Sequence, residues 1–587
     1  MEKCKQLLSC ILEKVRAISF ESVVVRLLSA WAIMGVCQNL KIRDSIYFTH
    51  NFFFDRFSFA ESFLLTLVLF AILCLPLFRK AMKGILWGSF FLLFIRTLWQ
   101  RSDFGFYMGA TLIMALITAY AFKDVKFKQD IKRPVMWGLT LPFTALVVTL
   151  IITVSVLLYK AVWTPTYDFG IFSQMFYYMK ETFIPYTTCE RDKFLSHFAV
   201  HFSPVYYLML PVYIVFPSPV TLLVLSPVIS ASGIIPLVLL CKKYKHSNLT
   251  TLFLTVCYMG IPAITGGNLY YIHENVFLSP LLLWLFYFFE KKNTPLTVVF
   301  AFLVMLVKED APVYIFVFAL YLLISKRNKS LGLLLMGLAI IYFAFVLSFL
   351  EKFGEGAMVG RFENFNKSGE PITLIGVIMT AFSNPAYLIS ECFENDRMLF
   401  LLQFFIPLMF IPFLTKKFSR YVLLAPVVII NLLSDYGYQH DMGYQYVFGS
   451  LAFAIYLCVM NSADMGQVKR SKILLLSATA SVMVFFSMYY PRFQVVESYR
   501  NNMPEHNAIE QALEKIPDDA SVVASTFFVA NLSQRDEIYE LESTKQKAEY
   551  YVLDLRYENA KCNVEDFQNE NYETIHHDEY IAIFKQN

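Results

Sequence analysis

Charged residues are scarce in this sequence: 16% of its 587 residues are charged, whereas 57% are hydrophobic. Soluble domains contain about 25% charged residues, so the composition excludes an ordinary soluble enzyme. Such a high hydrophobic content also excludes a disordered chain. Apolar runs recur that are close to the roughly 20 residues a helix needs to cross a bilayer. They are continuous rather than alternating, which excludes an outer-membrane barrel. The sequence therefore predicts a polytopic α-helical membrane protein.

Metal-binding and nucleotide-binding motifs are also missing. The ten cysteines are scattered and include no CxxC pair, so no zinc or haem spacing is present. They are predicted to act as small buried hydrophobic residues. The net charge of +4 predicts no nucleic-acid partner, because membrane proteins concentrate Lys and Arg in cytoplasmic loops.

About 15 apolar spans are predicted from the lengths of the apolar runs. Seven clusters of Lys and Arg each follow an even-numbered span. The positive-inside rule then places these clusters and the N-terminus in the cytoplasm. An odd number of spans places the C-terminus outside, and a bacterial plasma membrane is the expected location. The predicted spans are 21–40, 58–78, 84–99, 105–122, 136–160, 220–240, 249–265, 276–290, 295–307, 311–325, 331–350, 398–415, 421–435, 444–460 and 473–490.

The predicted domain organisation has four parts. Residues 1–20 carry apolar residues on one helical face and form a cytoplasmic interfacial helix. Residues 21–135 form an N-terminal membrane extension of four helices. Residues 136–490 form the transmembrane core, with a large outer loop at 161–219. Residues 491–587 form a soluble domain outside the cytoplasm.

The C-terminal part differs in charge from the rest of the chain. It carries nine Lys and Arg residues against 19 Asp and Glu residues, whereas the other 490 residues are basic overall. Residues 505–515 are predicted to be helical, and residues 521–525 and 550–555 are predicted to be strands of one sheet. This part is therefore a small α/β domain with no recognisable phosphate loop or catalytic triad.

Polar residues gather at the predicted outer ends of helices, where a charged group is costly and often functional. Each has a structural alternative: Asp168 as a helix cap, the loop histidines as interfacial residues, and the triplet 308–310 as a self-neutralising group. Four separate segments nevertheless bring a carboxylate or a histidine to one face of the membrane. The candidates are Asp168, Gln174, His197, His201, His273, Glu274, Lys308, Glu309, Asp310, His440 and Asp441.

Several of these segments carry a family resemblance. The stretches YDFGIFSQ at 167–174, HFSPVYYLMLPVYIVFPSPVTLLVLSP at 201–227, YIHENVF at 271–277 and VKEDAP at 307–312 resemble a bacterial family of predicted polytopic membrane proteins, the domain-of-unknown-function family 2079. In the C-terminal part, 516–541 and 550–556 also resemble it. The resemblance covers about residues 136–560, so the first four spans lie outside the family core.

That family is in turn similar to the GT-C glycosyltransferases, which transfer a sugar from a lipid-phosphate donor. The resemblance implies that the fifth span delivers Asp168 into an outer loop of short helices at 169–219. It implies a polyprenyl-phosphate sugar donor, a cell-envelope acceptor and Asp168 as the general base. Lys308 is then the candidate partner of the phosphate, with Arg361 as a second.

The resemblance also implies residues that would bind a metal ion or the substrate. Asp168, His201, His273 and Asp310 are the candidates for a divalent metal ion. The candidate substrate-binding residues are Gln174, His201, His273, Glu274, Lys308, Glu309, Arg361 and His440.

Two other functions fit a membrane protein of this kind. A transporter or flippase for a lipid-linked or polar solute predicts inverted repeats and helices broken at mid-membrane. No repeat is visible, and the polar residues cluster at one face. A non-catalytic scaffold that displays the C-terminal domain leaves Asp168, His273 and Glu309 without a role.

Overall fold

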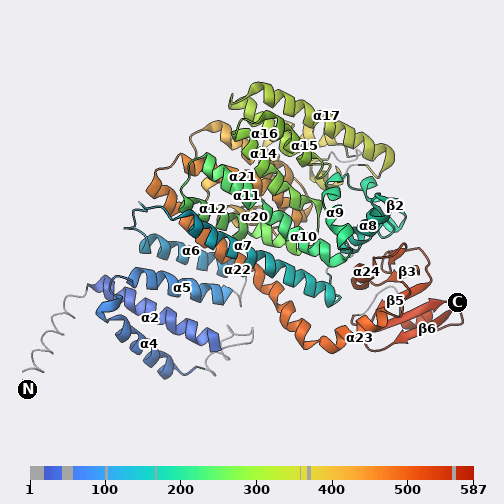
Figure 1. The fold of residues 1–587 in the computed structure, drawn as a ribbon, viewed down its shortest axis with the longest axis horizontal. Coiled ribbons are helices and arrows are strands. Elements are labelled where there is room, and N and C mark those ends of the chain that lie inside the picture. Colours follow the sequence, from blue (N-terminus) through green and yellow to red (C-terminus); the bar gives the residue numbers. More distant parts are fainter. Residues whose placement is uncertain are drawn as a thin grey trace, which may run out of the picture. The chain divides into compact units, whose positions relative to one another are not determined.

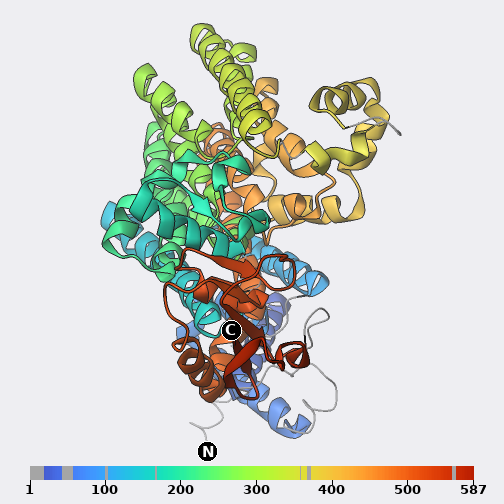
Figure 2. The same cartoon turned by 90° about the vertical axis from the view of Figure 1, so that its right-hand side faces the viewer.

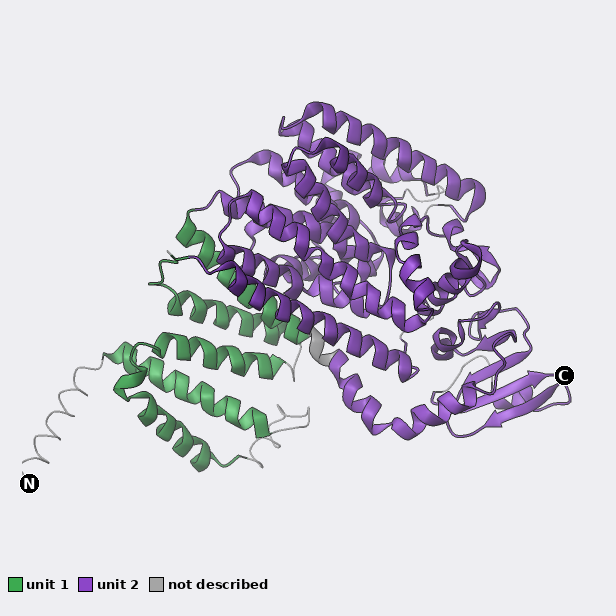
Figure 3. Ribbon diagram, in the orientation of Figure 1, with its two compact units in different colours: residues 1–129, 466–491 green, residues 130–465, 492–587 purple. Residues whose placement is uncertain are grey.

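The protein is mainly helical, with a small C-terminal sheet (Figure 1). The computed structural model describes residues 19–41, 57–98, 103–127, 129–164, 168–356, 359–366, 372–557 and 563–587, apart from the side chains of 488–491. The interfacial helix predicted at 1–20 falls almost wholly outside these residues. Two compact units are present, residues 1–129 with 466–491 and residues 130–465 with 492–587 (Figure 3).

Unit 1 contains the four helices predicted near the N-terminus. Helix α2 lies against α4 and α5, and α5 lies against α6. Their shared core includes Leu86, Phe90 and Met114, together with Met483 from the first part of α22. The predicted last span therefore groups with the N-terminal helices, not with the core at 136–490. The elements are α2 (Phe20–Lys41), α4 (Phe59–Leu73), η1 (Pro76–Phe78), α5 (Met82–Leu98), α6 (Phe104–Ala121) and α22 (Gln467–Asn501).

The helical part of unit 2 begins with α7 (Arg133–Lys160), the predicted fifth span. Contacts join α7 to α10 and α12, and α14 to α11, α15 and α21. Helix α21 is buried along almost its whole length, which agrees with its apolar sequence. The other helices are α10 (Pro219–Ser232), α11 (Ile234–Lys243), α12 (Asn248–Gly260), α13 (Pro262–Leu269), α14 (Leu278–Glu290), α15 (Thr294–Met305), α16 (Pro312–Ile324), α17 (Lys329–Phe353), α20 (Asn395–Phe405) and α21 (Phe448–Ala463).

Two predicted spans are not single α-helices. The span 398–415 contains α20 and then a turn, where Met409 and Phe410 have positive φ, followed by η7 (Ile411–Phe413). The span 421–435 overlaps the 3₁₀-helix η8 (Phe418–Leu424) and contains the π-helix η9 (Val427–Leu432). Prolines stand at 407, 412 and 426, and each removes a backbone donor and clashes with the preceding turn. An average of hydropathy over these residues does not detect the interruption of the helix by proline.

Short elements connect the helices on the side of the cavity described below. The segment after α7 contains α8 (Asp168–Thr182), β1 (Tyr186–Thr187), η2 (Glu190–Asp192), β2 (Leu195–Ser196), η3 (His197–Ala199), η4 (Pro204–Leu208) and α9 (Leu210–Val215). The segment thus consists of short elements, as predicted for residues 169–219. The other short elements of unit 2 on this side are η5 (Glu274–Phe277), η6 (Val359–Phe365), α18 (Leu374–Ser383), α19 (Pro385–Cys392), η10 (Gly437–His440) and η11 (Gln445–Val447).

The C-terminal part contains a five-stranded mixed sheet in the order β4-β3-β5-β7-β6. Strand β3 pairs in parallel with β4 and β5, so the two strands predicted from sequence are neighbours. Alternate residues face opposite sides, as the two-residue period of a strand requires. Val522 and Val552 therefore enter one core, and Val523 and Tyr551 the other. The elements are α23 (Met503–Leu513), β3 (Val522–Ala524), α24 (Thr526–Leu532), β4 (Ile538–Glu540), β5 (Tyr550–Asp554), η12 (Val564–Phe567), β6 (Tyr572–His577) and β7 (Ile581–Gln586).

The sheet domain is continuous with α8. Its first core includes Val162, Ile171 and Cys189 from the segment after α7. Gly170 makes the close approach possible, since a Cβ there would lie 2.7 Å from Val529 Cγ1. Figure 1 shows α8 beside α24 and β3. The C-terminal domain therefore packs directly on the segment predicted to be the outer loop.

Eight helices in the described part of the chain are long and apolar enough to cross a membrane. They are Phe20–Lys41, Phe104–Ala121, Arg133–Lys160, Pro219–Lys243, Asn248–Leu269, Lys329–Phe353, Gln445–Ala463 and Gln467–Asn501. Shorter apolar helices of 10–17 residues are also present, Phe59–Leu73, Thr294–Met305, Pro312–Ile324, Leu374–Ser383 and Phe418–Leu432.

Candidate functional site

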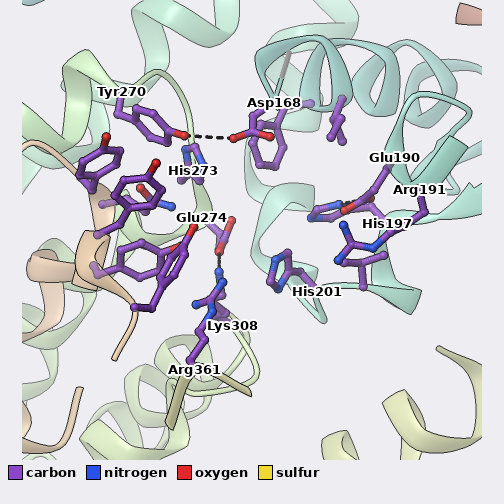
Figure 4. Close-up of a pocket in the computed structure, with 18 of the residues that line it drawn as sticks. Asp168, Glu190, Arg191, His197, His201, Tyr270, His273, Glu274, Lys308 and Arg361 are labelled. Carbon is purple, nitrogen blue, oxygen red and sulfur yellow. Dashed lines mark hydrogen bonds and ion pairs between the residues drawn. The ribbon is translucent and has the colours of Figure 1, made fainter. Parts of the chain in front are cut away.

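A cavity of about 550 Å³ lies in unit 2 (Figure 4). Four chain segments that are distant in sequence contribute most of its lining: 168–201, 270–274, 360–361 and 435–446. Lys308 is added from the turn between α15 and α16. Of the candidate residues named from sequence, seven line this cavity: Asp168, His197, His201, His273, Glu274, Lys308 and Arg361. The structure thus brings seven of the candidate residues together.

Asp168 is the first residue of α8 and lines the cavity. A carboxylate in a first helical turn is favourable because the helix N-terminus carries partial positive charge. Its Oδ2 accepts a hydrogen bond of 3.2 Å from the Tyr270 hydroxyl. Asp168 therefore both begins the helix and presents a carboxylate to the cavity.

Glu274 and Lys308 form a buried ion pair. Lys308 Nζ lies 2.6 Å from Glu274 Oε1, and both side chains are nearly inaccessible. The Tyr206 hydroxyl donates to the other carboxylate oxygen at 2.7 Å. Burial alone would raise the pKa of Glu274, but Lys308 reverses this and holds the pKa well below its usual range. Burial likewise opposes the charge on Lys308, yet Glu274 keeps its pKa above the ordinary value.

Two histidines in the cavity wall are each held by a glutamate. His197 Nδ1 lies 2.8 Å from Glu190 Oε2, and His201 Nδ1 lies 2.9 Å from Glu309 Oε1. Burial opposes protonation of His197, but the Glu190 carboxylate outweighs it and raises the pKa of His197. His197 Nε2 is buried and has no hydrogen-bond partner in the described residues.

His273 behaves differently from His197. It is packed between aromatic rings, with ring centroids 5.0 Å from Phe172 and 5.3 Å from Tyr270. Burial lowers its pKa to about 3, so the imidazole is neutral at neutral pH. Its Nδ1 is buried and lacks a partner among the residues that the structure describes. A neutral imidazole can donate one hydrogen bond and accept another.

Arg361 supplies a cation from η6. Its guanidinium lies 4.7 Å from the ring centre of Tyr436 and 5.3 Å from that of Tyr446. Within the described ranges no carboxylate forms a salt bridge with it. Lys308 is already neutralised by Glu274, so Arg361 is the better candidate for binding an anion. Figure 4 shows Asp168 near one end of the cavity and Arg361 near the other, with Glu274 and Lys308 between them.

Tyrosines form much of the remaining wall. They come from the turn after α13 and from the stretch DYGYQHDMGYQY at 435–446. The rings contact one another, with centroid distances of 4.6 Å for Tyr270–Tyr444 and 4.2 Å for Tyr438–Tyr444. Gly266 permits this arrangement, because a Cβ there would collide with the Met442 carbonyl. The tyrosine wall consists of Tyr270, Tyr436, Tyr438, Tyr444 and Tyr446.

Five candidate residues lie outside the lining: Gln174, Glu309, Asp310, His440 and Asp441. Glu309 is the partner of His201, and Asp310 is buried, which raises its pKa to about 6. His440 Nε2 lies 2.7 Å from Asp396 Oδ2. Gln174 is fully buried and hydrogen bonds to the Arg535 and Asp536 carbonyls. Gln174 therefore joins α8 to the C-terminal domain instead of facing a substrate.

The predicted metal ligands do not converge. Across the described ranges, no group of three or more His, Cys, Asp or Glu residues could hold a metal ion. Asp168 bonds to Tyr270, His201 bonds to Glu309, and Asp310 does not line the cavity. The set Asp168, His201, His273 and Asp310 therefore does not fit a common metal site.

Sequence reasoning missed several lining residues. Glu190 and Arg191 stand in η2, and Arg191 has positive φ and pairs with Glu355 at 2.6 Å. The tyrosine wall was also missed, although four tyrosines within twelve residues at 435–446 are a visible signal. A tyrosine ring is amphipathic, with a flat apolar face and a polar hydroxyl, so four tyrosines beside His440 and Asp441 are a sequence signal that predicts a binding surface.

The cavity thus combines a carboxylate, a wall of tyrosine rings and a cation that pairs with no carboxylate in the described part of the chain. A comparison with curated proteins finds no match. Residues 158–580 match the family described as predicted membrane protein, DUF2079. This range contains every residue that lines the cavity. With most of its length matched, the chain belongs to the DUF2079 family of predicted membrane proteins.

Proposed function

We propose that this protein is a GT-C-like glycosyltransferase that transfers a sugar from a polyprenyl-phosphate donor to a cell-envelope acceptor at the outer face of a bacterial plasma membrane. The observation that carries the proposal is the cavity, in which Asp168 and Arg361 lie toward opposite ends. The tyrosine wall between these ends offers flat apolar faces to sugar rings and hydroxyls to their polar edges. The family match supports the membrane setting of this chemistry.

The reaction assigns one role to each end of the cavity. Asp168 accepts the proton of the acceptor hydroxyl, and the freed oxygen attacks the anomeric carbon. The bond from that carbon to the phosphate oxygen breaks, and its electron pair leaves with the phosphate. Arg361 stabilises the departing phosphate, because a guanidinium matches phosphate oxygens in pairs. Lys308 was the first candidate for this role, but its ion pair with Glu274 makes it part of the cavity framework.

The proposal includes a topology of about 15 crossings around a GT-C-like core, with the N-terminus in the cytoplasm. The seven basic clusters and the short helices after α7 support this topology. The acceptor is not identified by the cavity, whose lining residues suit any hydroxyl-bearing sugar.

The test is sugar transfer from a labelled polyprenyl-phosphate donor by the purified protein. Asp168→Asn keeps the size of the side chain and removes its charge, so turnover should fall about 10²–10⁴-fold. Asp441→Asn is the matched control, because Asp441 is exposed in the same region and does not line the cavity. Both variants should elute as monodisperse protein. Near-normal turnover by Asp168→Asn would remove Asp168 from the mechanism.

A further inference from the structure

Helix α18 presents an apolar face that the described part of the protein does not cover. Ile375, Ile378, Met379 and Phe382 are 70%, 48%, 65% and 85% exposed. Their spacing of three and four residues places them on one side of the helix. Figure 2 shows the yellow segment that contains α18 at the edge of unit 2. Four adjacent large apolar side chains would form an unfavourable patch in water.

The composition of this segment indicates the kind of surface that covers it. Residues 372–390 contain no Asp, Glu, Lys or Arg. With 10 residues, α18 is about 15 Å long, roughly half the hydrocarbon thickness of a bilayer. It is therefore too short to span, but its one-sided apolar face is typical of a helix that lies in the membrane interface. The α-helix that precedes it, α17, is one of the candidate membrane spans and ends at Phe353, a short stretch of chain before Leu374.

The opposite face of α18 packs against the segment that carries Arg361. Val377 and Ala381 form a small core with Phe365 from η6. Helix α19 adds a second connection, because the Tyr387 hydroxyl donates to the Asn364 carbonyl at 2.8 Å. Whatever surface holds the exposed face of α18 therefore also fixes the position of η6 and Arg361.

We propose that α18 lies in the membrane interface on the side of the cavity, with its exposed face in the lipid hydrocarbon. This places Arg361, which stands in η6 next to Phe362 of the same small core, near the level of the lipid headgroups. A lipid-linked phosphate then reaches the guanidinium while its chain remains in the bilayer. The position of α18 follows from its exposed apolar face and its length. The binding of a lipid-linked phosphate by Arg361 rests on the proposed function.

The membrane position is tested in vesicles of phosphatidylethanolamine and phosphatidylglycerol that contain a lipid with a doxyl quencher high on its acyl chain. An environment-sensitive fluorescent amino acid replaces Phe382 in one sample and the exposed Lys545 of the C-terminal domain in another. The label at 382 should be quenched at least about twofold more strongly than the label at 545, because only the former contacts acyl chains. Equal, weak quenching at both positions would overturn the proposal.

The coupling to Arg361 is tested with Phe382→Glu, which puts a charge on the exposed face. The KM for a long-chain polyprenyl-phosphate donor should rise about tenfold, while the KM for a short, water-soluble donor should stay unchanged. Phe418→Glu is the matched control, because Phe418 is 81% exposed on a different segment, and it should leave both values unchanged. An equal rise for both donors would contradict the coupling. If the wild-type protein transfers no sugar at all, the proposed function fails, and the quenching result still decides the position of α18.

Discussion

Residues that line the cavity have either a proposed chemical role or a structural role. The Glu274–Lys308 ion pair illustrates the structural role. Removing one partner of a buried ion pair leaves an uncompensated charge, whereas removing both does not. Lys308→Met should therefore destabilise the protein by about 3–5 kcal/mol. The double variant Lys308→Met with Glu274→Gln should recover most of this loss, because the Tyr206 hydroxyl, which donates to the Glu274 carboxylate, can equally donate to an amide oxygen at this position.

The measurement is the melting temperature in detergent for the wild type, both single variants and the double variant. The double-variant comparison separates a lost interaction from a stranded charge. If the double variant melts as low as Lys308→Met, the pair does more than neutralise charge.

The His197–Glu190 pair predicts a pH dependence of stability. The pKa of His197 is raised in the folded protein above its usual value. Its contribution to stability is therefore fully present below the unfolded pKa, about 6.5, and is lost as the pH rises through the folded pKa. Glu190→Gln removes the partner, so the melting temperature should differ most from that of the wild type at low pH.

This difference should shrink as the pH rises above about 6.5 and through the folded pKa of His197, because neutral His197 gains little from Glu190. Glu537→Gln is the control, since Glu537 is exposed on the C-terminal domain, and its difference from the wild type should stay flat. A Glu190→Gln difference that grows with pH would contradict the assignment.

At the scale of elements, the contact between α8 and the C-terminal domain fixes part of the cavity wall. The Gln174 amide donates to Thr188 Oγ1 at 2.9 Å and accepts from the Thr188 backbone N–H at 2.9 Å. Thr188 Oγ1 in turn donates to the Ile538 carbonyl at 2.9 Å and accepts from the Ile538 N–H at 3.0 Å. Glu190 and Arg191 follow directly in the chain. The C-terminal domain therefore positions the segment that holds His197.

Thr188→Val tests this positioning, because it keeps the shape of the side chain and removes the hydroxyl. It should lower kcat/KM about 10–100-fold, since small displacements of site groups are costly. Thr188→Ser keeps the hydroxyl and should restore activity. Ser533→Ala is the control, because it breaks a hydrogen bond of 2.7 Å between α24 and α8 without touching residues 188–197. Equal losses in Thr188→Val and Ser533→Ala would mean that only stability is affected.

The elements that sequence predicted well are those set by local composition. The first four spans match α2, α4, α5 and α6, and the strands at 521–525 and 550–555 match β3 and β5. Hydropathy and two-residue alternation are local signals, and they suffice here. The predicted spans around 398–435 are broken because single prolines override an apolar average.

For the site residues, the sequence predicts which residues are candidates better than it predicts what each one does. Asp168, His273 and Lys308 could be predicted because a charged or titratable residue is rare in an apolar sequence. The role of Gln174 could not be, because its partners at 535–536 lie more than 350 residues away. The role of Lys308 could not be predicted either. Its ion pair with Glu274 makes it part of the cavity framework instead of a phosphate ligand. Residue type is local, but the role depends on partners that only the fold brings together.

For the whole molecule, the contacts of the C-terminal domain constrain the number of membrane crossings. The domain packs on α8, so the segment after α7 and the end of the chain lie on the same side of the membrane. An even number of crossings must therefore separate them. The long candidate spans after α8 in the described residues number five: Pro219–Lys243, Asn248–Leu269, Lys329–Phe353, Gln445–Ala463 and Gln467–Asn501. If all five cross, at least one of the shorter apolar helices must cross as well, because five is odd.

The last prediction follows from this parity and from the basic clusters, which give about ten crossings after α8 and about five before it. We expect the N-terminus in the cytoplasm and the C-terminus outside. A reporter enzyme that is active only outside the cytoplasm should therefore be active when fused after Asn587. The same reporter fused after Lys292, within a basic cluster, should be inactive while the fusion protein is present at a similar level. An inactive fusion at Asn587 would place the C-terminal domain, and with it α8 and the cavity, on the cytoplasmic side. The sugar donor would then have to be reached from the inner leaflet, so this measurement decides the side of the membrane on which the whole site works.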